Sequence, residues 1–131
     1  MTGEKDLDKL LKTMTPLLNN GDYVFCTVAE MDEIPSDQVV SFFREQEGFT
    51  LIMEKSVADE LGLFYDYVTA WITLTVHSSL EAIGLTAAFS AALANEGISC
   101  NVVAAYYHDH IFVAKADAAR AISVLKKISA V

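Results

Sequence analysis

The chain has few positive charges. Its 131 residues include 9 lysines and arginines against 18 aspartates and glutamates, a formal net charge of −9. Residues 1–68 contain 14 of the acids and 5 of the bases, so the excess negative charge lies in the first half. A phosphate backbone or an anionic membrane surface binds through a basic stripe, and the sequence contains none. Nucleic acid and membrane are therefore not expected partners.

Cysteines and nucleotide-binding motifs are also scarce. Cys26 and Cys100 each lie in an apolar, strand-like run, where a cysteine usually behaves as a small buried hydrophobic residue. Two cysteines so far apart form neither a disulfide framework nor a zinc knuckle. The chain has no G-x-x-x-x-G-K-[ST] phosphate loop and no G-x-G-x-x-G dinucleotide motif. We therefore expect no metal and no cofactor.

Long apolar runs are absent as well. The stretch MTGEKDLDKLLK at the start is charged and lacks the apolar core of a signal peptide. No uninterrupted apolar stretch approaches the length of a membrane span. We expect a cytoplasmic protein.

Hydrophobic residues are nevertheless abundant, at 53% of the chain. A globular domain of average composition has about 45–50%. A domain of this size has difficulty burying so much apolar surface by itself. The composition therefore predicts an oligomer interface, and at least a homodimer.

The second half of the chain alternates between strand and helix patterns. Runs of β-branched and aromatic residues predict strands at 69–77, 98–107 and 111–115. Helical periodicity covers 85–97, which ends at Gly97, and 117–128, which Asp117 can cap. The order β-α-β-β-α is one strand short of a ferredoxin-like split βαβ sandwich. Because an open strand edge invites unwanted pairing, either the first half or a second subunit is expected to supply the missing strand.

The first half repeats the alternation less clearly. Helices are predicted at 7–14 and 56–63, and strands at 23–30 and 49–54. The stretch SDQVVSFFREQEG is predicted to form a short helix, capped by Ser36 or Asp37 and ended by Gly48. The strand order of this half is left open. The predicted fold class is an α+β sandwich with an antiparallel-rich sheet and helices on one side.

The segment VHSSLEAIGLTAAFSAALANEGISCNVVAAYYHDHIFV resembles the ACT domain, a small-molecule-sensing module attached to amino-acid biosynthetic enzymes such as aspartokinase. The shared features are a strand, a loop ending in Gly84, a helix ending in ALANEGI, and the strand that contains Asn101. With REQEGFTLIM, the whole chain is similar to stand-alone bacterial proteins built from two ACT-like units. The resemblance implies tandem ferredoxin-like ACT units: a degenerate one at residues 1–66 and a second at 67–131, or one continuous compact fold.

The resemblance also implies a ligand site at the interface of paired units. In the family this site uses the loop after the first strand, the start of the first helix and the start of the second strand. The chemistry agrees, because free N–H groups at a helix start suit a carboxylate and Gly84 allows close approach to the backbone. Asn101 offers both donors and an acceptor to an amino-acid head group. A purely structural role for both residues is left open. The residues at these positions are His77, Ser78, Ser79, Gly84, Leu85, Thr86, Asn101 and Val102.

The YYHDHIF stretch suggests a metal site as an alternative, since histidine is the commonest metal ligand. The expected geometry places His77 at the end of the first strand, beside Asn101. His108 and His110 are then expected in a hairpin at the opposite end of the sheet, on the order of 20 Å away. This arrangement favours an exposed polar turn over a metal site.

Nucleophilic catalysis is also disfavoured. His77 and Ser79 could meet, but Glu81 is the only acid in the same loop that could orient the histidine. The sequence therefore predicts no enzyme, but a regulatory or sensor protein that binds an amino acid or a similar anion. The alternative is a structural oligomerisation module with a vestigial pocket. An enzyme would return as a candidate if the loop at 77–81 were buried beside a deep cleft.

Overall fold

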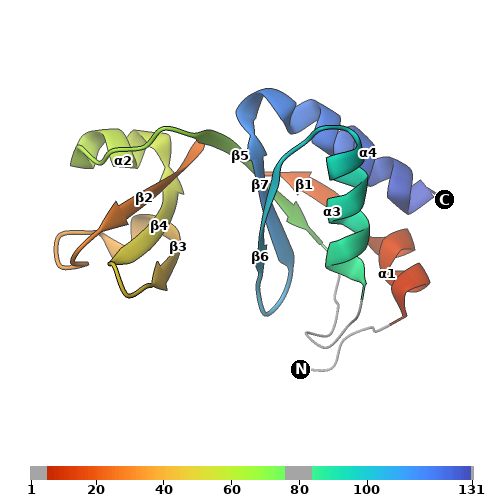
Figure 1. Cartoon of the computed structure of the whole chain (residues 1–131), viewed down its shortest axis with the longest axis horizontal. Coiled ribbons are helices and arrows are strands. Elements are labelled where there is room, and N and C mark those ends of the chain that lie inside the picture. Colours follow the sequence, from red (N-terminus) through yellow and green to blue (C-terminus); the bar gives the residue numbers. More distant parts are fainter. Residues whose placement is uncertain (1–5, 76–83, 131) are drawn as a thin grey trace. The chain divides into compact units, whose positions relative to one another are not determined.

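The structure is a computed structural model that describes residues 6–75 and 84–130 (Figure 1). The chain divides into two compact units. The central unit is Asn20–Thr69, and the terminal unit combines Met1–Asn19 with Ala70–Val131. This division differs from the one expected from the sequence, because the segment before Asn20 groups with the C-terminal half of the chain.

The terminal unit obtains its missing strand from the N-terminal segment. The elements β5 (Val68–Leu74), α3 (Leu85–Asn95), β6 (Cys100–Ala104), β7 (Asp109–Ala114) and α4 (Ala118–Ala130) follow the predicted order β-α-β-β-α. The short strand β1 (Pro16–Leu18) pairs antiparallel with β5. The strand order is β1-β5-β7-β6, so β1 takes the place of the last strand in a ferredoxin-like sheet. The first half of the chain therefore covers this edge of β5.

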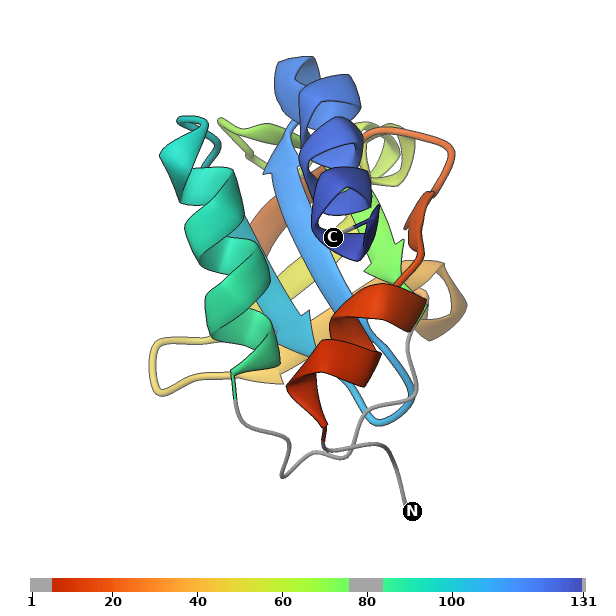
Figure 2. The same cartoon turned by 90° about the vertical axis from the view of Figure 1, so that its right-hand side faces the viewer.

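Helices α1, which spans Leu7–Thr13, α3 and α4 cover one face of this sheet (Figure 2). Helix α1 precedes β1 and packs against α3 and α4. The Asp6 carboxylate caps α1 by accepting hydrogen bonds from the backbone N–H groups of Asp8 and Lys9. The predicted placement of helices on one side of the sheet is thus confirmed for this unit. Its apolar core includes Leu10, Met14, Ile72, Leu74, Leu85, Phe89, Leu93, Ile111, Val113 and Leu125.

The central unit has the same strand order with fewer helices. The strands β2 (Tyr23–Val28), β3 (Val39–Arg44) and β4 (Phe49–Glu54) precede α2 (Lys55–Leu61). The order is β3-β4-β2-β5, where the start of β5 pairs with β2 and each neighbouring pair is antiparallel. Gly62 ends α2 with a φ of 69°, a left-handed conformation that favours glycine, inside the range 56–63 where the sequence predicts a helix. The core of this unit consists of Val24, Cys26, Leu51, Met53 and Ala58.

The predicted helix at 36–48 is wrong. Ser36–Gln38 form only a short 3₁₀ turn, and Val39–Arg44 form strand β3, which pairs with β4. The apolar pairs at 39–40 and 42–43 are spaced like one face of a helix, but β-branched and aromatic residues also suit a strand. Glu45 and Gly48 then close a β-turn, in which the Glu45 N–H donates to the Gly48 carbonyl at 2.8 Å.

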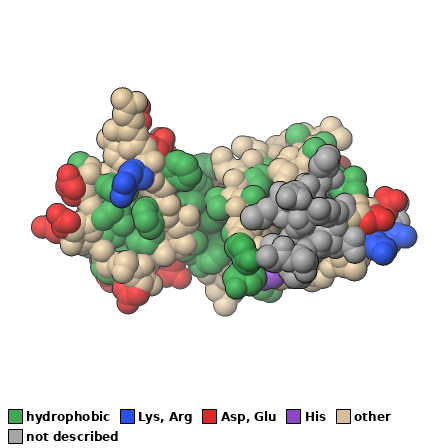
Figure 3. Space-filling view, turned by 90° about the horizontal axis from the view of Figure 1, so that it is seen from below, with side chains coloured by type: hydrophobic (Ala, Val, Ile, Leu, Met, Phe, Trp, Pro, Cys, Tyr) green, Lys and Arg blue, Asp and Glu red, His purple; other side chains and the backbone are tan. Residues whose placement is uncertain are grey.

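Strand β3 lies at one edge of the central sheet and exposes aromatic side chains. Phe42 is 56% exposed and Phe43 is 70% exposed. Figure 3 shows hydrophobic side chains among acidic ones on one face of this unit. An exposed apolar strand edge tends to pair with another chain, so β3 is a candidate for the interface that the apolar composition predicts.

Candidate functional site

Helix α3 begins where the ligand site is expected. Gly84 is its N-cap, with a φ of 95°, a left-handed conformation that favours glycine. No side chain of the described residues caps α3, and its first turn carries no acid. The first backbone N–H groups and the positive end of the helix dipole therefore suit an anion. Leu85 is buried in the core, and Thr86 is exposed.

A side chain of α1 lies against Gly84. A Cβ atom added to Gly84 would be 3.2 Å from Cδ2 of Leu7. The absence of a side chain at Gly84 thus makes room for Leu7, at a position where the sequence predicts a ligand. The other predicted loop residues, His77, Ser78 and Ser79, lie outside the described residues.

Asn101 and Val102 lie at the start of β6, at the opposite end of the strand from the hairpin. Asn101 is exposed, and its side-chain amide donates a hydrogen bond to the backbone carbonyl of Phe112 at 3.4 Å. Val102 is half-buried. Strand β6 and helix α3 begin at opposite ends of the sheet. Within one unit, Asn101 and Val102 therefore do not lie close to the start of α3.

Contacts across the sheet fix the direction of β5. The Trp71 ring stacks on Phe112 with centroids 6.1 Å apart, and Thr73 Oγ1 lies 3.0 Å from His110 Nδ1. From Trp71 to Thr73, β5 therefore moves from beside Phe112 to beside His110. Phe112 pairs with Asn101, and His110 is next to the β6–β7 hairpin, so β5 runs away from Asn101 and toward this hairpin. From the sequence, we expected the hairpin at the opposite end of the sheet from the last residues of β5. This prediction is wrong, because β5 ends beside the hairpin. The prediction took two antiparallel neighbours of a ferredoxin-like sheet to be parallel.

The YYHDH hairpin is only partly exposed. Its tip, Ala105–His108, closes through a backbone hydrogen bond of 3.1 Å, and Tyr106 and Tyr107 face solvent. Asp109 and His110 already belong to β7, and Asp109 is only 8% exposed. The expected polar turn is therefore corrected to a short tip followed by a partly buried strand. The sequence could have predicted this burial, because side chains alternate along a strand and residue 109 shares a face with residues 111 and 113 of the apolar run.

Two residues of β5 hold His110 on the face of the sheet away from the helices. The Trp71 indole N–H donates to His110 Nδ1 at 3.1 Å, and Thr73 Oγ1 lies 3.0 Å from the same nitrogen. Because an indole can only donate, Nδ1 accepts, and the neutral ring carries its proton on Nε2. Asn19 extends the network by donating its side-chain amide to Thr73 Oγ1 at 2.9 Å. Burial, with a smaller effect from His108, lowers the pKa of His110.

The free energy of unfolding should therefore decrease as the pH falls below about 6.5. The pKa of His110 is lower in the folded than in the unfolded chain. The stability that the neutral His110 side chain contributes is therefore complete above the pKa of the unfolded chain, and it is lost as the pH falls through the pKa of the folded chain. Trp71 is the only tryptophan, so its fluorescence during urea denaturation measures the effect. His110→Gln should show a weaker pH dependence between about pH 5 and 7 than wild type, and His108→Gln should keep it. Equal pH dependence in all three proteins would contradict the assignment.

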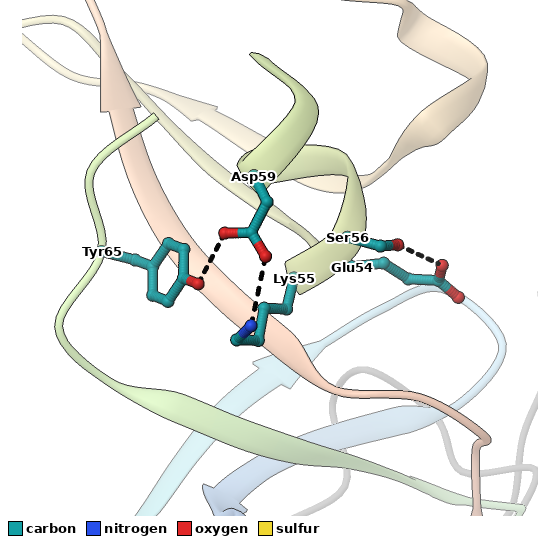
Figure 4. A network of polar contacts seen from close by, with 5 residues as sticks. All are labelled: Glu54, Lys55, Ser56, Asp59 and Tyr65. Atoms are coloured by element: carbon teal, nitrogen blue, oxygen red, sulfur yellow. Dashed lines mark hydrogen bonds and ion pairs between the residues drawn. The ribbon is translucent and has the colours of Figure 1, made fainter. Parts of the chain in front are cut away.

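The central unit contains a polar cavity of about 310 Å³ beside α2. Lys55 Nζ lies 3.1 Å from Asp59 Oδ2, and the Tyr65 hydroxyl donates to Asp59 Oδ1 at 2.6 Å (Figure 4). The Tyr65 hydrogen bond, followed by that of Lys55, lowers the pKa of the Asp59 carboxyl. These side chains satisfy one another, so the network has a structural role. The lining residues are Gly21, Asp22, Glu54, Lys55, Ser56 and Asp59.

A second cavity of the central unit, of about 340 Å³, lies between the segment after β2 and the end of α2. Its acidic lining residues are Glu30, Asp32 and Glu33, and its apolar ones include Ile34 and Leu63. Three carboxylates repel an anion. The terminal unit therefore offers the better site for a ligand that carries a carboxylate.

Residues 6–75 and 84–130 contain no group of three or more His, Cys, Asp or Glu side chains that could hold a metal ion. Both cysteines are free. Burial raises the pKa of the Cys100 thiol to about 11 and also raises the pKa of Cys26. A thiol that resists ionisation is a poor nucleophile.

Family models for the ACT domain match adjacent parts of the chain. One matches residues 2–70 and a second matches residues 67–127. The chain belongs to the ACT-domain family. The resemblance noted in the sequence is thereby confirmed, as two ACT-type domains in tandem. No curated protein matches the chain.

Solved structures agree with this assignment. A Vibrio cholerae protein of unknown function, for which a transport role has been suggested, is 48% identical, with a TM-score of 0.85 over 95% of this chain and 97% of that one. The aspartokinase alpha and beta subunits are 12% identical, with a TM-score of 0.64 over 89% of this chain and 98% of that one. A C-terminal domain of aspartate kinase from Porphyromonas gingivalis W83, described as regulatory, is 13% identical, with a TM-score of 0.56 over 88% and 96%.

The two aspartokinase structures show the fold alone, because their identities are low. They confirm the predicted α+β, ferredoxin-like ACT fold. Family membership supports a regulatory, ligand-binding role. No helix of the described ranges is long and apolar enough to cross a membrane.

Proposed function

We propose that the protein is a cytoplasmic regulator or sensor without catalytic activity, which binds an amino acid or a similar small anion. The observation that carries this proposal is the uncapped start of α3 behind Gly84, in a chain whose two halves both match ACT domains. Free N–H groups and the helix dipole stabilise a carboxylate at this position. The proposed ligand-binding residues are His77, Ser78, Ser79, Gly84, Leu85, Thr86, Asn101 and Val102.

A homodimer explains how one site can include both ends of the terminal unit. Strand β6 is the edge strand of the order β1-β5-β7-β6. If two copies pair their β6 edges antiparallel about a two-fold axis, the start of β6 in one copy lies beside the hairpin end of the other. Asn101 of the second copy then lies near the start of α3 in the first copy. The site is therefore proposed to form between copies.

The dimer can be tested by light scattering at micromolar concentration. A single chain has a mass of 14.3 kDa, so the homodimer should give about twice this mass. A monomer mass over the whole concentration range would contradict the proposal. In that case Asn101 and the start of α3 could not share a ligand.

Replacing Asn101 by alanine should weaken amino-acid binding by about 1–3 kcal/mol, because polar atoms of the buried ligand lose their partner. The ligand is first found by a thermal-shift screen of the twenty amino acids, since a ligand at about 100 times its Kd adds about 2.7 kcal/mol of stability. Calorimetry then compares the variant with wild type. Asn95→Ala is the matched control, because Asn95 is exposed at the other end of α3. Equal affinity in Asn101→Ala and wild type would remove Asn101 from the site.

A structural oligomerisation module is the second candidate function. The exposed Phe42 and Phe43 on the edge strand β3 favour it, as does the packing of Leu7 on Gly84. A stable dimer that gives no thermal shift with any of the twenty amino acids would support this candidate over the sensor.

A further inference from the structure

The outer edge of strand β3 offers backbone groups to a further strand. Glu45 and Gly48 exchange two hydrogen bonds, of 2.8 and 3.3 Å, across the turn that follows β3. Hydrogen-bonded and non-hydrogen-bonded pairs alternate along an antiparallel ladder, so Phe42 and Arg44 occupy the non-hydrogen-bonded positions opposite β4. Their backbone N–H and C=O groups therefore point away from β4. Among the described residues, no strand lies on that side of β3 (Figure 1).

Phe42 and Phe43 extend the apolar surface of the central sheet on both of its faces. Phe42 pairs with Leu51 of the buried core, and its ring centroid lies 6.2 Å from that of Phe49. Phe43 follows Phe42 along the strand, so its side chain points to the other face. The two residues are 56% and 70% exposed. A strand added beside β3 would cover both of them if it carried apolar residues at consecutive positions.

The central unit carries the whole net charge of the chain. Asn20–Thr69 include 11 aspartates and glutamates but only two basic residues, Arg44 and Lys55, which leaves a charge of −9. Lys55 is also paired with Asp59, at 3.1 Å. The terminal unit has equal numbers of acidic and basic residues. The unit that contains β3 therefore attracts a positively charged partner.

Charge also argues against a second copy as the occupant of this edge. Asp37 precedes β3, Glu45 and Glu47 follow it, and all three residues are exposed. Antiparallel pairing of two β3 strands about a two-fold axis brings the end of one strand beside the start of the other. Acids of one copy would then face acids of the other, and like charges at an interface cost free energy. A positively charged segment of a different protein avoids this repulsion.

We propose that β3 binds an extended, positively charged segment of a partner protein, which adds a strand to the central sheet. The segment pairs its backbone with Phe42 and Arg44, and it places consecutive apolar residues beside Phe42 and Phe43. Lysines or arginines flank these apolar residues and lie near the acids on either side of β3. This proposal goes beyond the proposed function and does not rest on the ligand site, because it gives the central unit a surface for contact with another protein.

The first test measures the binding of synthetic peptides by fluorescence anisotropy. The probe is a fluorescein-labelled peptide of sequence KKVIVKK, and the controls are EEVIVEE and KKVIVKK with its three central amides methylated. The basic peptide should bind at least about tenfold more tightly than either control, because one control reverses the charge and the other lacks the N–H donors. Added salt should weaken its binding, since salt screens the attraction. The proposal is overturned if KKVIVKK does not bind, or if either control binds equally well.

The second test locates the peptide on the protein. Phe43→Thr keeps a β-branched residue in the strand and removes the exposed ring, so it should weaken binding of the basic peptide about fivefold or more. Phe64→Thr is the matched control, because Phe64 is 82% exposed in the same unit but outside any strand. This variant should bind as wild type does. Unchanged binding by Phe43→Thr, or equal losses in both variants, would refute the proposal.

Amide hydrogen exchange, followed by NMR, tests the strand pairing directly. The outward N–H groups of Phe42 and Arg44 should exchange more slowly once the basic peptide is bound, because they then donate hydrogen bonds to it. The exchange of the Phe64 amide should not change. Unaltered exchange at both Phe42 and Arg44 would show that the peptide does not add a strand to β3.

Light scattering distinguishes the basic partner from a second copy. Phe43→Thr should keep the mass of wild type, because the homodimer is proposed to form through β6. A variant that falls from dimer to monomer would show that β3 pairs with a second copy, and would refute the basic partner. A wild-type protein that binds the basic peptide but no amino acid would refute the sensor and leave this proposal standing, so the two fail separately.

Discussion

Replacing Leu10 by alanine should lower the free energy of unfolding by about 2–5 kcal/mol. Leu10 lies in α1, is 0% exposed, and packs in one cluster with residues of β5, α3 and α4 such as Leu74, Phe89 and Leu125. The substitution removes buried methyl groups and leaves a cavity that the surrounding side chains fill only in part. Because Trp71 lies in the same unit, its fluorescence during urea denaturation should follow the loss.

Leu17→Ala is the control for this experiment. Leu17 comes from the same N-terminal segment, but it lies on β1 and is 52% exposed. Its replacement should cost less than about 1 kcal/mol, since little apolar surface leaves contact with the protein. If Leu10→Ala left the Trp71 transition unchanged, the segment before Asn20 would not stabilise the terminal unit. The expected boundary near residue 66 would then describe the folding units better.

The strand β1 shows why the grouping of the segment before Asn20 with the C-terminal half could not be predicted from the sequence. Pro16–Leu18 is too short for a periodic pattern, and its status as a strand depends on pairing with Leu74, far along the chain. The need for such a strand was predicted, because the second half has one strand too few for a closed sandwich. Its source is a long-range property that local patterns do not contain.

The correctly predicted elements depend on local chemistry. Gly62 and Gly97 end helices with positive φ, and the helix at 117–128 shows a clear apolar stripe. The failure at 36–48 concerns a segment whose pattern suits both a helix and a strand. Hydrogen bonding to β4 decides in favour of the strand, and the sequence of the segment alone cannot reveal this partner.

The geometry around the candidate site was predicted only in part, for a similar reason. The glycine before α3 and the free start of the helix follow from the sequence and the family resemblance. The burial of Asp109 was missed because two flanking histidines make the stretch look like a polar turn, whereas this burial depends on sharing a face with Ile111. The wrong strand direction then separated the hairpin from the start of α3, although both lie at one end (Figure 2).

Replacing Gly84 by valine should destabilise the protein before it affects any ligand. The φ of 95° at this position is unfavourable for a β-branched residue and costs about 1–3 kcal/mol. A Cβ atom would also lie 3.2 Å from Leu7 Cδ2, and the γ-methyl groups add further bulk beside α1. This overpacking should add about 1–3 kcal/mol to the loss, which urea denaturation measures.

Gly97→Val separates the two causes. Gly97 has a φ of 73°, and a Cβ atom there would meet nothing within 4 Å, so this variant should show the backbone strain alone. Adding Leu7→Ala to Gly84→Val should then recover part of the extra loss, because the truncated side chain makes room for the valine. If Gly84→Val and Gly97→Val cost the same and Leu7→Ala recovers nothing, Leu7 does not constrain Gly84. The glycine would then be free for the close approach of a ligand, and amino-acid binding by Gly84→Ala becomes the decisive measurement of its role.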